Sequence, residues 1–250
     1  MRIKLLQWNI FYKEKIQRIT ETIKKINPDI VNLQELVVDC QFNPTVHETA
    51  KYVGESLGYN YFWGISQTWP EGVRNKRAQG NGIFSRFSII KRQSKHIQKP
   101  TINPKGPFDE GRIYVEAQLK IGDKTLNVGT THLSYVHKFS ISERKKKEVN
   151  NLVKILKQKK SNFVFSGDLN STPGSYTVEQ ISKYLKNCGP LFDQPTWTTK
   201  PMTDYKGWTQ DELKWRLDYV FATKDIKVIS SKIIKTKYSD HLPILVTLEI

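Results

Sequence analysis

The sequence predicts one α/β domain over residues 1–250, in which two mostly antiparallel sheets pack face to face and helices cover their outer sides. Two observations predict it. Short apolar strands alternate with amphipathic helices, and the order strand–helix–strand occurs twice along the chain. A length of 250 residues is enough for one large domain with a sizeable core. The hydrophobic content of 38% is typical of a folded protein and not of a disordered one.

The first strand–helix–strand unit lies at the start of the chain. Residues 3–8 alternate like a strand. The helix after them is predicted by a stripe of apolar residues at helical spacing: Ile16, Ile19, Ile23 and Ile26. Asn27–Pro28 ends this helix, because proline disfavours helical backbone in the residue before it. Residues 29–33 then predict a second strand, which ends at Gln34–Glu35.

The second unit has the same layout. A strand over residues 125–131 ends at His132, a helix follows, and a strand over residues 163–166 ends at Asp168. The helix is predicted to begin at a capping box formed by Ser140 and Glu143. Its inner face would consist of Val149, Leu152, Val153 and Leu156.

The remaining elements complete the two sheets. Between the units the sequence predicts a helix near 46–57, a hairpin around 80–91 and a strand near 112–120. After them it predicts a short helix near 177–186, an aromatic loop over 195–215, and strands near 217–222, 226–236 and 243–249. No linker-like tract interrupts the pattern, which favours a single domain.

The chain is strongly basic. Lysine and arginine number 40 against 24 acidic residues, which gives a formal net charge of +16. This charge favours a polyanionic partner such as nucleic acid or an anionic membrane surface, although lysine-rich surfaces also arise from genome composition. We expect the basic run 144–147 to be a solvated face of its helix.

Cysteine usage and the N-terminus suggest a cytoplasmic protein. Cys40 and Cys188 lie far apart and form no metal-binding or redox motif. Met1 is followed at once by strand-like residues, which leaves no room for a signal peptide, and no apolar run reaches membrane-spanning length.

Polar and ionisable residues stand where the apolar strands end. The stretch FVFSGDLNSTPGSY, residues 163–176, shows the pattern, because an apolar strand runs directly into a carboxylate and a carboxamide. The whole set is Asn9, Glu35, His132, Asp168, Asn170, Asp218 and Asp240–His241. One such residue is explained by turn chemistry, but a set this large would gather several carboxylates if the strands end at one edge. Carboxylates that repel one another are relieved by a divalent cation, and a set rich in oxygen and free of cysteine suits Mg²⁺ or Mn²⁺.

These motifs resemble those of the endonuclease/exonuclease/phosphatase superfamily, whose fold is deoxyribonuclease I-like. The segments that carry the resemblance occur in the family's order: QWNI, LQE, GNGIFSR, TTHL, SGDLNSTP, RLDYVF and SDHLP. The resemblance extends from residue 3 to residue 249, essentially the whole chain. The resemblance implies a four-layered α/β sandwich and Mg²⁺-dependent hydrolysis of a phosphodiester or phosphomonoester.

The resemblance also implies roles for the residues at the strand ends. Glu35 would bind the metal directly, and Asn9 and Asp240 would be further ligands or partners of the ligands. Asp168 would orient or deprotonate the attacking water, and Asn170 would donate a hydrogen bond to that water or to a phosphoryl oxygen.

Two histidines would face the phosphate. His241, held by Asp218, would act either as a general base or as a protonated stabiliser of charge, and His132 would be a second imidazole donor. Structural alternatives remain for two residues. His132 could be a histidine at a strand end without catalytic function, and Asp218 could form a salt bridge with Arg216 or Arg112.

Two departures from the motifs of abasic-site endonucleases make that activity less favoured. Phe11 stands where many of those enzymes have an acidic residue, and His132 stands where they tend to have tyrosine. The histidine is more similar to deoxyribonuclease I, deadenylases, sphingomyelinases and the phosphodiesterase that removes tyrosine from 5′ DNA ends. The lack of a signal peptide argues against an extracellular deoxyribonuclease.

Two segments are candidates for substrate binding. The loop 66–82 combines the aromatic Trp69 with Arg74, Lys76 and Arg77, a mixture that can grip phosphates and stack on a base, although a solvated loop is the alternative. The stretch 196–215 carries Trp197, Tyr205, Trp208 and Trp215 and could form a platform for a base or a lid over a lipid headgroup. Asn81 and Arg112 complete the predicted substrate-binding set.

The leading hypothesis is a Mg²⁺- or Mn²⁺-dependent nuclease or DNA/RNA phosphodiesterase that acts as a monomer without an obligate protein partner. The alternative is a hydrolase of the same chemistry that acts on a lipid headgroup or a small phosphorylated molecule. A catalytically inactive binding module is disfavoured, because every expected catalytic position is filled. The choice between DNA and RNA, and between endo- and exonucleolytic action, depends on loop shape and not on these motifs.

Overall fold

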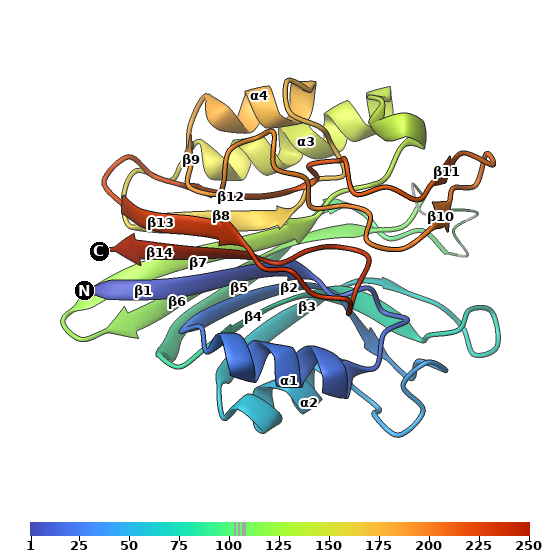
Figure 1. Cartoon of the computed structure of the whole chain (residues 1–250), viewed down its shortest axis with the longest axis horizontal. Coiled ribbons are helices and arrows are strands. Elements are labelled where there is room, and N and C mark those ends of the chain that lie inside the picture. Colours follow the sequence, from blue (N-terminus) through green and yellow to red (C-terminus); the bar gives the residue numbers. More distant parts are fainter. Residues whose placement is uncertain (103, 105, 107–108) are drawn as a thin grey trace.

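Two six-stranded sheets lie face to face at the centre of the molecule, and helices cover their outer faces (Figure 1). The computed structural model describes residues 1–102, 104, 106 and 109–250. In spatial order the first sheet contains β13 (Lys227–Ile233), β14 (Ile244–Glu249), β1 (Arg2–Asn9), β2 (Ile30–Val38), β4 (Ala78–Ser85) and β3 (Asn60–Thr68). The second contains β5 (Ser88–Gln98), β6 (Arg112–Ile121), β7 (Lys124–His132), β8 (Phe163–Asp168), β12 (Asp218–Ala222) and β9 (Lys186–Asn187). The predicted α/β sandwich is confirmed.

The outer layers consist of two helices on each side. The first sheet is covered by α1 (Ile16–Ile26) and α2 (Thr49–Leu57), and the second by α3 (Glu143–Leu156) and α4 (Tyr176–Ser182) (Figure 1). Helix α1 ends as predicted, because Asn27 adopts a left-handed conformation and its N–H bonds to Ile23 O at 2.9 Å. No helix in the described ranges is long and apolar enough to cross a membrane.

The two predicted strand–helix–strand units are present and place their strand ends at one edge. Strands β1 and β2 are parallel, and so are β7 and β8, with α1 and α3 as the respective crossovers. Asn9 is in register with Gln34 in the first pair, and His132 with Asp168 in the second. The carboxyl ends of parallel strands point the same way, so each unit delivers its terminal polar residues to the same edge of its sheet.

The space between the sheets is apolar toward one end and polar toward the other. A large buried cluster that includes Leu5, Val115, Val164 and Val246 fills the apolar part. The polar part is a network of buried side chains, which we call the polar seam: Gln7, Asn32, Gln34, Thr130 and Ser166. Its hydrogen bonds cross between the sheets, for example from Gln34 Nε2 to Thr130 Oγ1 at 2.9 Å and from Asn32 Nδ2 to Ser166 Oγ at 2.8 Å.

Some predicted elements differ from the structure. The hairpin around 80–91 is wrong, because β4 pairs with β2 and β3 whereas β5 pairs with β6 in the other sheet. The chain therefore changes sheets at Arg86–Phe87, and a two-residue break of this kind has the same sequence pattern as a hairpin turn. Strand β3 was not predicted, and the helix near 177–186 ends at Ser182.

The start of α3 and the aromatic loop also need correction. The N-cap of α3 is Ser142, whose side chain accepts a hydrogen bond from the N–H of Lys145, and Ser140 ends a short 3-10 turn over His137–Phe139. The predicted loop 195–215 contains a two-stranded sheet of β10 (Met202–Thr203) and β11 (Thr209–Gln210).

Candidate active site

A cavity of about 840 Å³ opens at the edge where the strands of both sheets end. It is lined by most of the predicted catalytic and metal-binding residues: Asn9, Glu35, His132, Asp168, Asn170, Asp240 and His241. Asp218 lies directly behind His241 and is fully buried. The structure therefore brings the whole predicted set together from both sheets.

The Asp168 carboxylate is the meeting point of this cluster. Its Oδ2 lies 2.9 Å from Asn9 Nδ2, 3.3 Å from His132 Nε2 and 3.6 Å from His241 Nε2. Burial raises the pKa of Asp168, but the imidazoles of His241 and His132 and the hydrogen bonds lower it more, so this pKa lies well below its usual range. Asp168 is therefore an ionised carboxylate at neutral pH.

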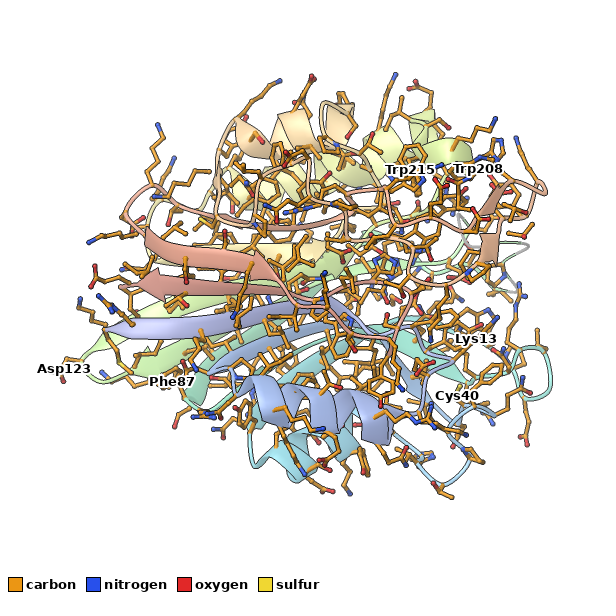
Figure 2. The ribbon with its side chains drawn as sticks, in the orientation of Figure 1. Lys13, Cys40, Phe87, Asp123, Trp208 and Trp215 are labelled. Carbon is orange, nitrogen blue, oxygen red and sulfur yellow. The ribbon has the colours of Figure 1, made fainter. Side chains whose placement is uncertain are left out.

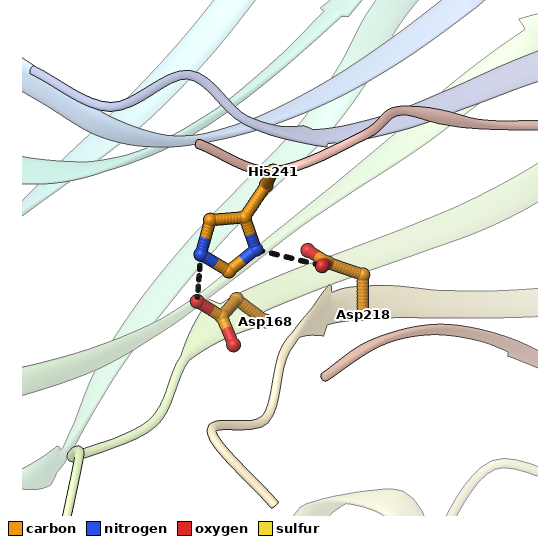
Figure 3. A group of neighbouring side chains, drawn as sticks. All are labelled: Asp168, Asp218 and His241. Carbon is orange, nitrogen blue, oxygen red and sulfur yellow. Dashed lines mark hydrogen bonds and ion pairs between the residues drawn. The ribbon is translucent and has the colours of Figure 1, made fainter. Parts of the chain in front are cut away.

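The His241 ring lies between two carboxylates (Figure 3). Its Nδ1 is 2.8 Å from Asp218 Oδ2, and its Nε2 faces Asp168. Burial lowers the pKa of His241, but Asp218, Asp168 and Asp240 raise it to about 10. The ring is therefore protonated at neutral pH. Arg216 donates to the backbone carbonyl of Asp218 at 2.7 Å, whereas the Asp218 carboxylate bonds to His241.

The sequence predicts that Glu35 ends its strand, but in the structure Glu35 lies in a β-bulge within the strand. Strand β2 continues to Val38, and its pairing with β4 shifts register between Gln34 and Leu36. Glu35 has a φ of 66°, which is in the left-handed region. A bulge leaves its extra residue unpaired and re-aims the side chain, so Glu35 lines the cavity although the strand runs on.

The carboxylates of Glu35 and Asp240 fit a hard divalent cation. Burial raises the pKa of Asp240, and the negative charge of Glu35 raises it further, although His241 lowers it. Both carboxylates line the cavity. Asn9 presents its amide nitrogen to Glu35 Oε1 at 3.4 Å, so it orients this carboxylate as a donor. A donor set of oxygens without sulfur suits Mg²⁺ or Mn²⁺.

A second group of potential ligand atoms belongs to Asp168, Asp218 and His241, which lie within 4.8 Å of one another. Both nitrogens of His241 face carboxylates in this group, Nδ1 at 2.8 Å from Asp218 Oδ2 and Nε2 at 3.6 Å from Asp168 Oδ2. We therefore interpret this group as a hydrogen-bonded Asp–His–Asp network and not as a metal centre.

Asn170 and His132 complete the catalytic face. Asn170 Nδ2 lies 3.0 Å from His132 Nε2 and donates to Leu133 O at 2.9 Å. The backbone N–H of Asn170 donates to Asp168 Oδ1 at 2.8 Å, which fixes the carboxylate relative to the loop. Both side chains border the cavity, so a phosphoryl oxygen could replace their mutual contact.

Sequence analysis missed two buried charged residues on α3 that support this face. Lys145 is fully buried, so the expected solvated face is wrong at this position, and its Nζ donates to Leu169 O at 3.1 Å and to Asn170 O. Glu148 Oε1 accepts a hydrogen bond of 2.9 Å from the N–H of Ser134. Helical spacing indicates the burial of Lys145, because it lies four residues before the buried Val149 and therefore on the same face of the helix.

The predicted substrate-binding residues divide into two groups. Those that line the cavity are Trp69, Arg74, Arg112, Trp197 and Trp208. Arg77 lies outside it and pairs with Glu71 on the surface at 3.2 Å. Asn81 is buried and does not line the cavity. Its side chain donates to Ile113 O at 3.0 Å and so links β4 of the first sheet to β6 of the second.

Aromatic side chains form one wall of the cavity. Phe139 lies 5.4 Å from Trp197 and 5.6 Å from Trp208, measured between ring centres, and it also contacts Trp215 at 5.2 Å. Figure 2 shows Trp208 and Trp215 together near the end of the molecule that carries β10 and β11. Asp204 anchors this wall, because its Oδ2 accepts from Tyr135 Oη at 2.7 Å.

The comparison with known families agrees with this geometry. The profile of the Endonuclease/Exonuclease/phosphatase family matches residues 6–241, so the chain belongs to this family. Its members are metal-dependent hydrolases that include phosphodiesterases, phosphatases and nucleases. No curated protein sequence matches the chain significantly.

Solved structures of the same deoxyribonuclease I-like fold cover nearly the whole chain. A family protein from Leptotrichia buccalis C-1013-b is 21% identical with a TM-score of 0.72, covering 99% of this chain and 100% of its own. TDP2 from D. rerio, complexed with single-strand DNA product, is 18% identical with a TM-score of 0.69, covering 100% and 99%. A mannosyl-6-phosphatase from Bacteroides thetaiotaomicron VPI-5482 is 16% identical with a TM-score of 0.66, covering 99% and 100%. At these identities the likeness establishes the fold alone.

The raised pKa of His241 predicts a pH-dependent stability of the metal-free protein. The pKa is 6.5 in the unfolded chain and about 10 in the folded one, so the folded state holds an additional proton between these values. The unfolding free energy should therefore fall as pH rises above 6.5, by up to about 1.4 kcal/mol per pH unit. Urea unfolding between pH 6.5 and 7.5 should show this slope in the wild type and a smaller one in His241→Gln. Equal slopes would contradict the assignment.

Lys145→Met should reduce turnover more than stability. Burial lowers the pKa of Lys145 from 10.5 to about 8 although Glu148 and Asp168 raise it, which corresponds to about 3 kcal/mol against the ammonium at neutral pH. Methionine removes the cost of burying the ammonium, but it leaves the carbonyls of Leu169 and Asn170 without a donor, at about 1–3 kcal/mol each. The two effects on stability oppose each other. The midpoint of thermal unfolding should change little, while kcat on a p-nitrophenyl phosphodiester should fall about tenfold. Lys146→Met, an exposed neighbour paired with Glu143, is the control. An unchanged kcat would disprove the positioning role.

Proposed function

We propose that the protein is a Mg²⁺- or Mn²⁺-dependent phosphodiester hydrolase that acts on nucleic acid, as an endo- or exonuclease or as a phosphodiesterase of DNA or RNA ends. We also propose that residues 1–250 form one domain and act as a cytoplasmic monomer. The observation that carries the function is the Asp168 carboxylate, which faces two imidazoles in a cavity with cationic and aromatic walls.

Each residue of the cluster has a role that its contacts support. Asp168 is held by Asn9 and the Asn170 N–H, so its carboxylate can orient an attacking water and accept a proton from it. Asn170 and His132 donate to phosphoryl oxygens. The raised pKa of His241 favours the protonated form, which would stabilise negative charge in the transition state and not act as a base.

The cation would be held by Glu35 and Asp240, with Asn9 orienting Glu35. A bound cation would stabilise the negative charge that develops on the phosphoryl and leaving oxygens. The Glu35 side of the cavity is further fixed by the N–H of Tyr12, which donates to Glu35 Oε2 at 2.9 Å. Trp197 Nε1 fixes Asp240 in the same way at 3.1 Å.

Charge and shape of the cavity support nucleic acid as the substrate. The net charge is +16, and Arg74 and Lys76 line the cavity together with the aromatic Trp69. Such a mixture binds phosphates and stacks on bases. The complex of D. rerio TDP2 with single-strand DNA product shows that this fold can hold such a ligand.

A small phosphorylated molecule or a lipid headgroup is the second candidate class. The wall of Phe139, Trp197 and Trp208 favours it, because an apolar wall of aromatic rings packed edge to face can cover a sugar or a headgroup as well as a base. The mannosyl-6-phosphatase of Bacteroides thetaiotaomicron VPI-5482 has the same fold.

The function is tested by cation-dependent hydrolysis across a panel of substrates. The panel contains single- and double-stranded DNA, an abasic duplex, RNA with a poly(A) tail, a 5′-tyrosyl oligonucleotide, a sphingomyelin analogue and a hexose 6-phosphate. We expect one nucleic acid to be cut with Mg²⁺ or Mn²⁺ and not with EDTA. Asp168→Asn should lower kcat by about 10²–10⁴-fold, as expected for loss of a general base.

The same panel separates the two substrate classes. Turnover of a nucleic acid should decline steeply as salt rises, because binding a polyanion releases counterions. Hydrolysis of the lipid analogue or the sugar phosphate alone, with little dependence on salt, would replace the nuclease proposal by the second candidate. Hydrolysis of none of these substrates with any divalent cation would contradict both.

A further inference from the structure

Lys76 is a buried cation that the catalytic cluster does not use. Its exposed fraction is 7%, and it lines the same cavity as Glu35 and Asp168. Its Nζ lies 3.3 Å from the centre of the Tyr12 ring and 5.2 Å from that of Trp69. Two aromatic rings therefore hold the ammonium at a fixed place in the cavity wall.

This ammonium has no oxygen partner among the residues that the structure describes. No carboxylate lies within 4.0 Å of it, and no carbonyl or side chain accepts a hydrogen bond from it. Glu35 and Glu110 act on it only at longer range. An ammonium carries three donors, and the Lys76 Nζ is not among the enclosed atoms without a partner, so its donors face the cavity and are open to an anionic ligand.

Lys76 is structurally connected to the Glu35 side of the site through Tyr12. The Tyr12 N–H donates to Glu35 Oε2 at 2.9 Å, and the ring of the same residue carries the Lys76 ammonium. Asn75 Nδ2 contacts Tyr12 Oη at 3.4 Å, which helps to fix the ring. The Lys76 ammonium therefore belongs to the Glu35 side of the cavity and not to the side where the imidazoles face Asp168.

Arg74 adds a second, exposed positive charge to the same wall. Its Nη2 donates to Pro104 O at 3.3 Å, and the rest of the guanidinium borders the cavity. Trp69, which is buried, closes the wall behind Lys76. The wall thus combines the buried Lys76 ammonium, the exposed Arg74 guanidinium and the apolar backing of Trp69, which suits a compact anion attached to a larger molecule.

We propose that Lys76, held by Tyr12 and Trp69, is a subsite for a second phosphate of the substrate, next to the one that is hydrolysed. The inference rests on the proposed function and deepens it, because it selects substrates with at least two phosphates, such as an oligonucleotide. A phosphomonoester with one phosphate, such as a sugar phosphate, would leave the subsite empty.

The test compares substrates that differ only in the second phosphate. They are thymidine 5′-(p-nitrophenyl phosphate) with and without a 3′-phosphate, and thymidine 3′-(p-nitrophenyl phosphate) with and without a 5′-phosphate. For at least one pair the wild type should show a kcat/KM about tenfold or more higher with the second phosphate, the gain expected for one charge-assisted hydrogen bond. Lys76→Met should reduce this ratio by a similar factor, and Lys76→Arg should restore part of it.

Lys124→Met is the charge-matched control. Lys124 is exposed at the start of β7, beside Asp123 and at the opposite end of the strand from His132, and Figure 2 shows Asp123 far from Trp208. The control should keep the wild-type ratio. A ratio near one for both wild-type pairs, or an unchanged ratio in Lys76→Met, would overturn the proposal.

Stability and binding measurements keep this result separate from folding and from catalysis. Because Lys76 is buried without an ion pair, Lys76→Met should unfold at the same or a higher temperature than the wild type. Calorimetric titration with thymidine 3′,5′-bisphosphate in EDTA should show weaker binding to Lys76→Met. If no ester is hydrolysed but this binding difference is present, the proposed function fails and the subsite stands. If esters are hydrolysed and the binding is equal, the subsite fails and the function stands.

Discussion

The polar seam between the two sheets is the constraint on which the site depends. Gln7, Gln34 and Ser166 bridge the sheets, and the hydrogen bond from Asn9 to Asp168 continues this link into the cavity. Because these groups are buried, each unmade hydrogen bond would be costly, so the sheets are held in one relative position. The carboxyl ends of four strands consequently meet at one point, although they come from distant parts of the sequence.

The charges in the cavity form two groups: the first sheet carries Glu35 and leads into Asp240 and His241, and the second sheet carries Asp168 and Asp218. On one side Asp218 and Asp168 hold the His241 ring in its protonated form. On the other side Glu35 and Asp240 both line the cavity, and we propose that they hold the divalent cation. In the proposed function, the imidazolium and the cation would therefore act on one phosphate from different positions.

Much of this arrangement could be predicted from the sequence, because a strand that ends in polar residues is a local signal. Asp168 and His132 were found in this way, and the two parallel units brought them into register. The bulge at Glu35 could not be predicted, since it depends on how β2 pairs with β4. Lys145 was misassigned for a similar reason: a lysine in a basic run is usually solvated, and only the packing of α3 buries this one.

The position of Arg77 illustrates the same limit. In the sequence it is equivalent to Lys76 and Arg74, but in the structure it pairs with Glu71 on the surface while Lys76 enters the cavity. The direction of each side chain is set by how the loop joins β4, which has no local pattern. Sequence analysis therefore found the chemistry of the site more completely than the residues that select its substrate.

The most direct test of this account is a Mn²⁺ titration of the metal-free protein, followed by the electron paramagnetic resonance signal of the free ion. We predict that the wild type binds Mn²⁺, that Glu35→Gln loses most of this binding, and that Asp218→Asn retains it. The reverse result, with binding lost in Asp218→Asn and kept in Glu35→Gln, would place the metal among Asp168, Asp218 and His241 and would contradict the account.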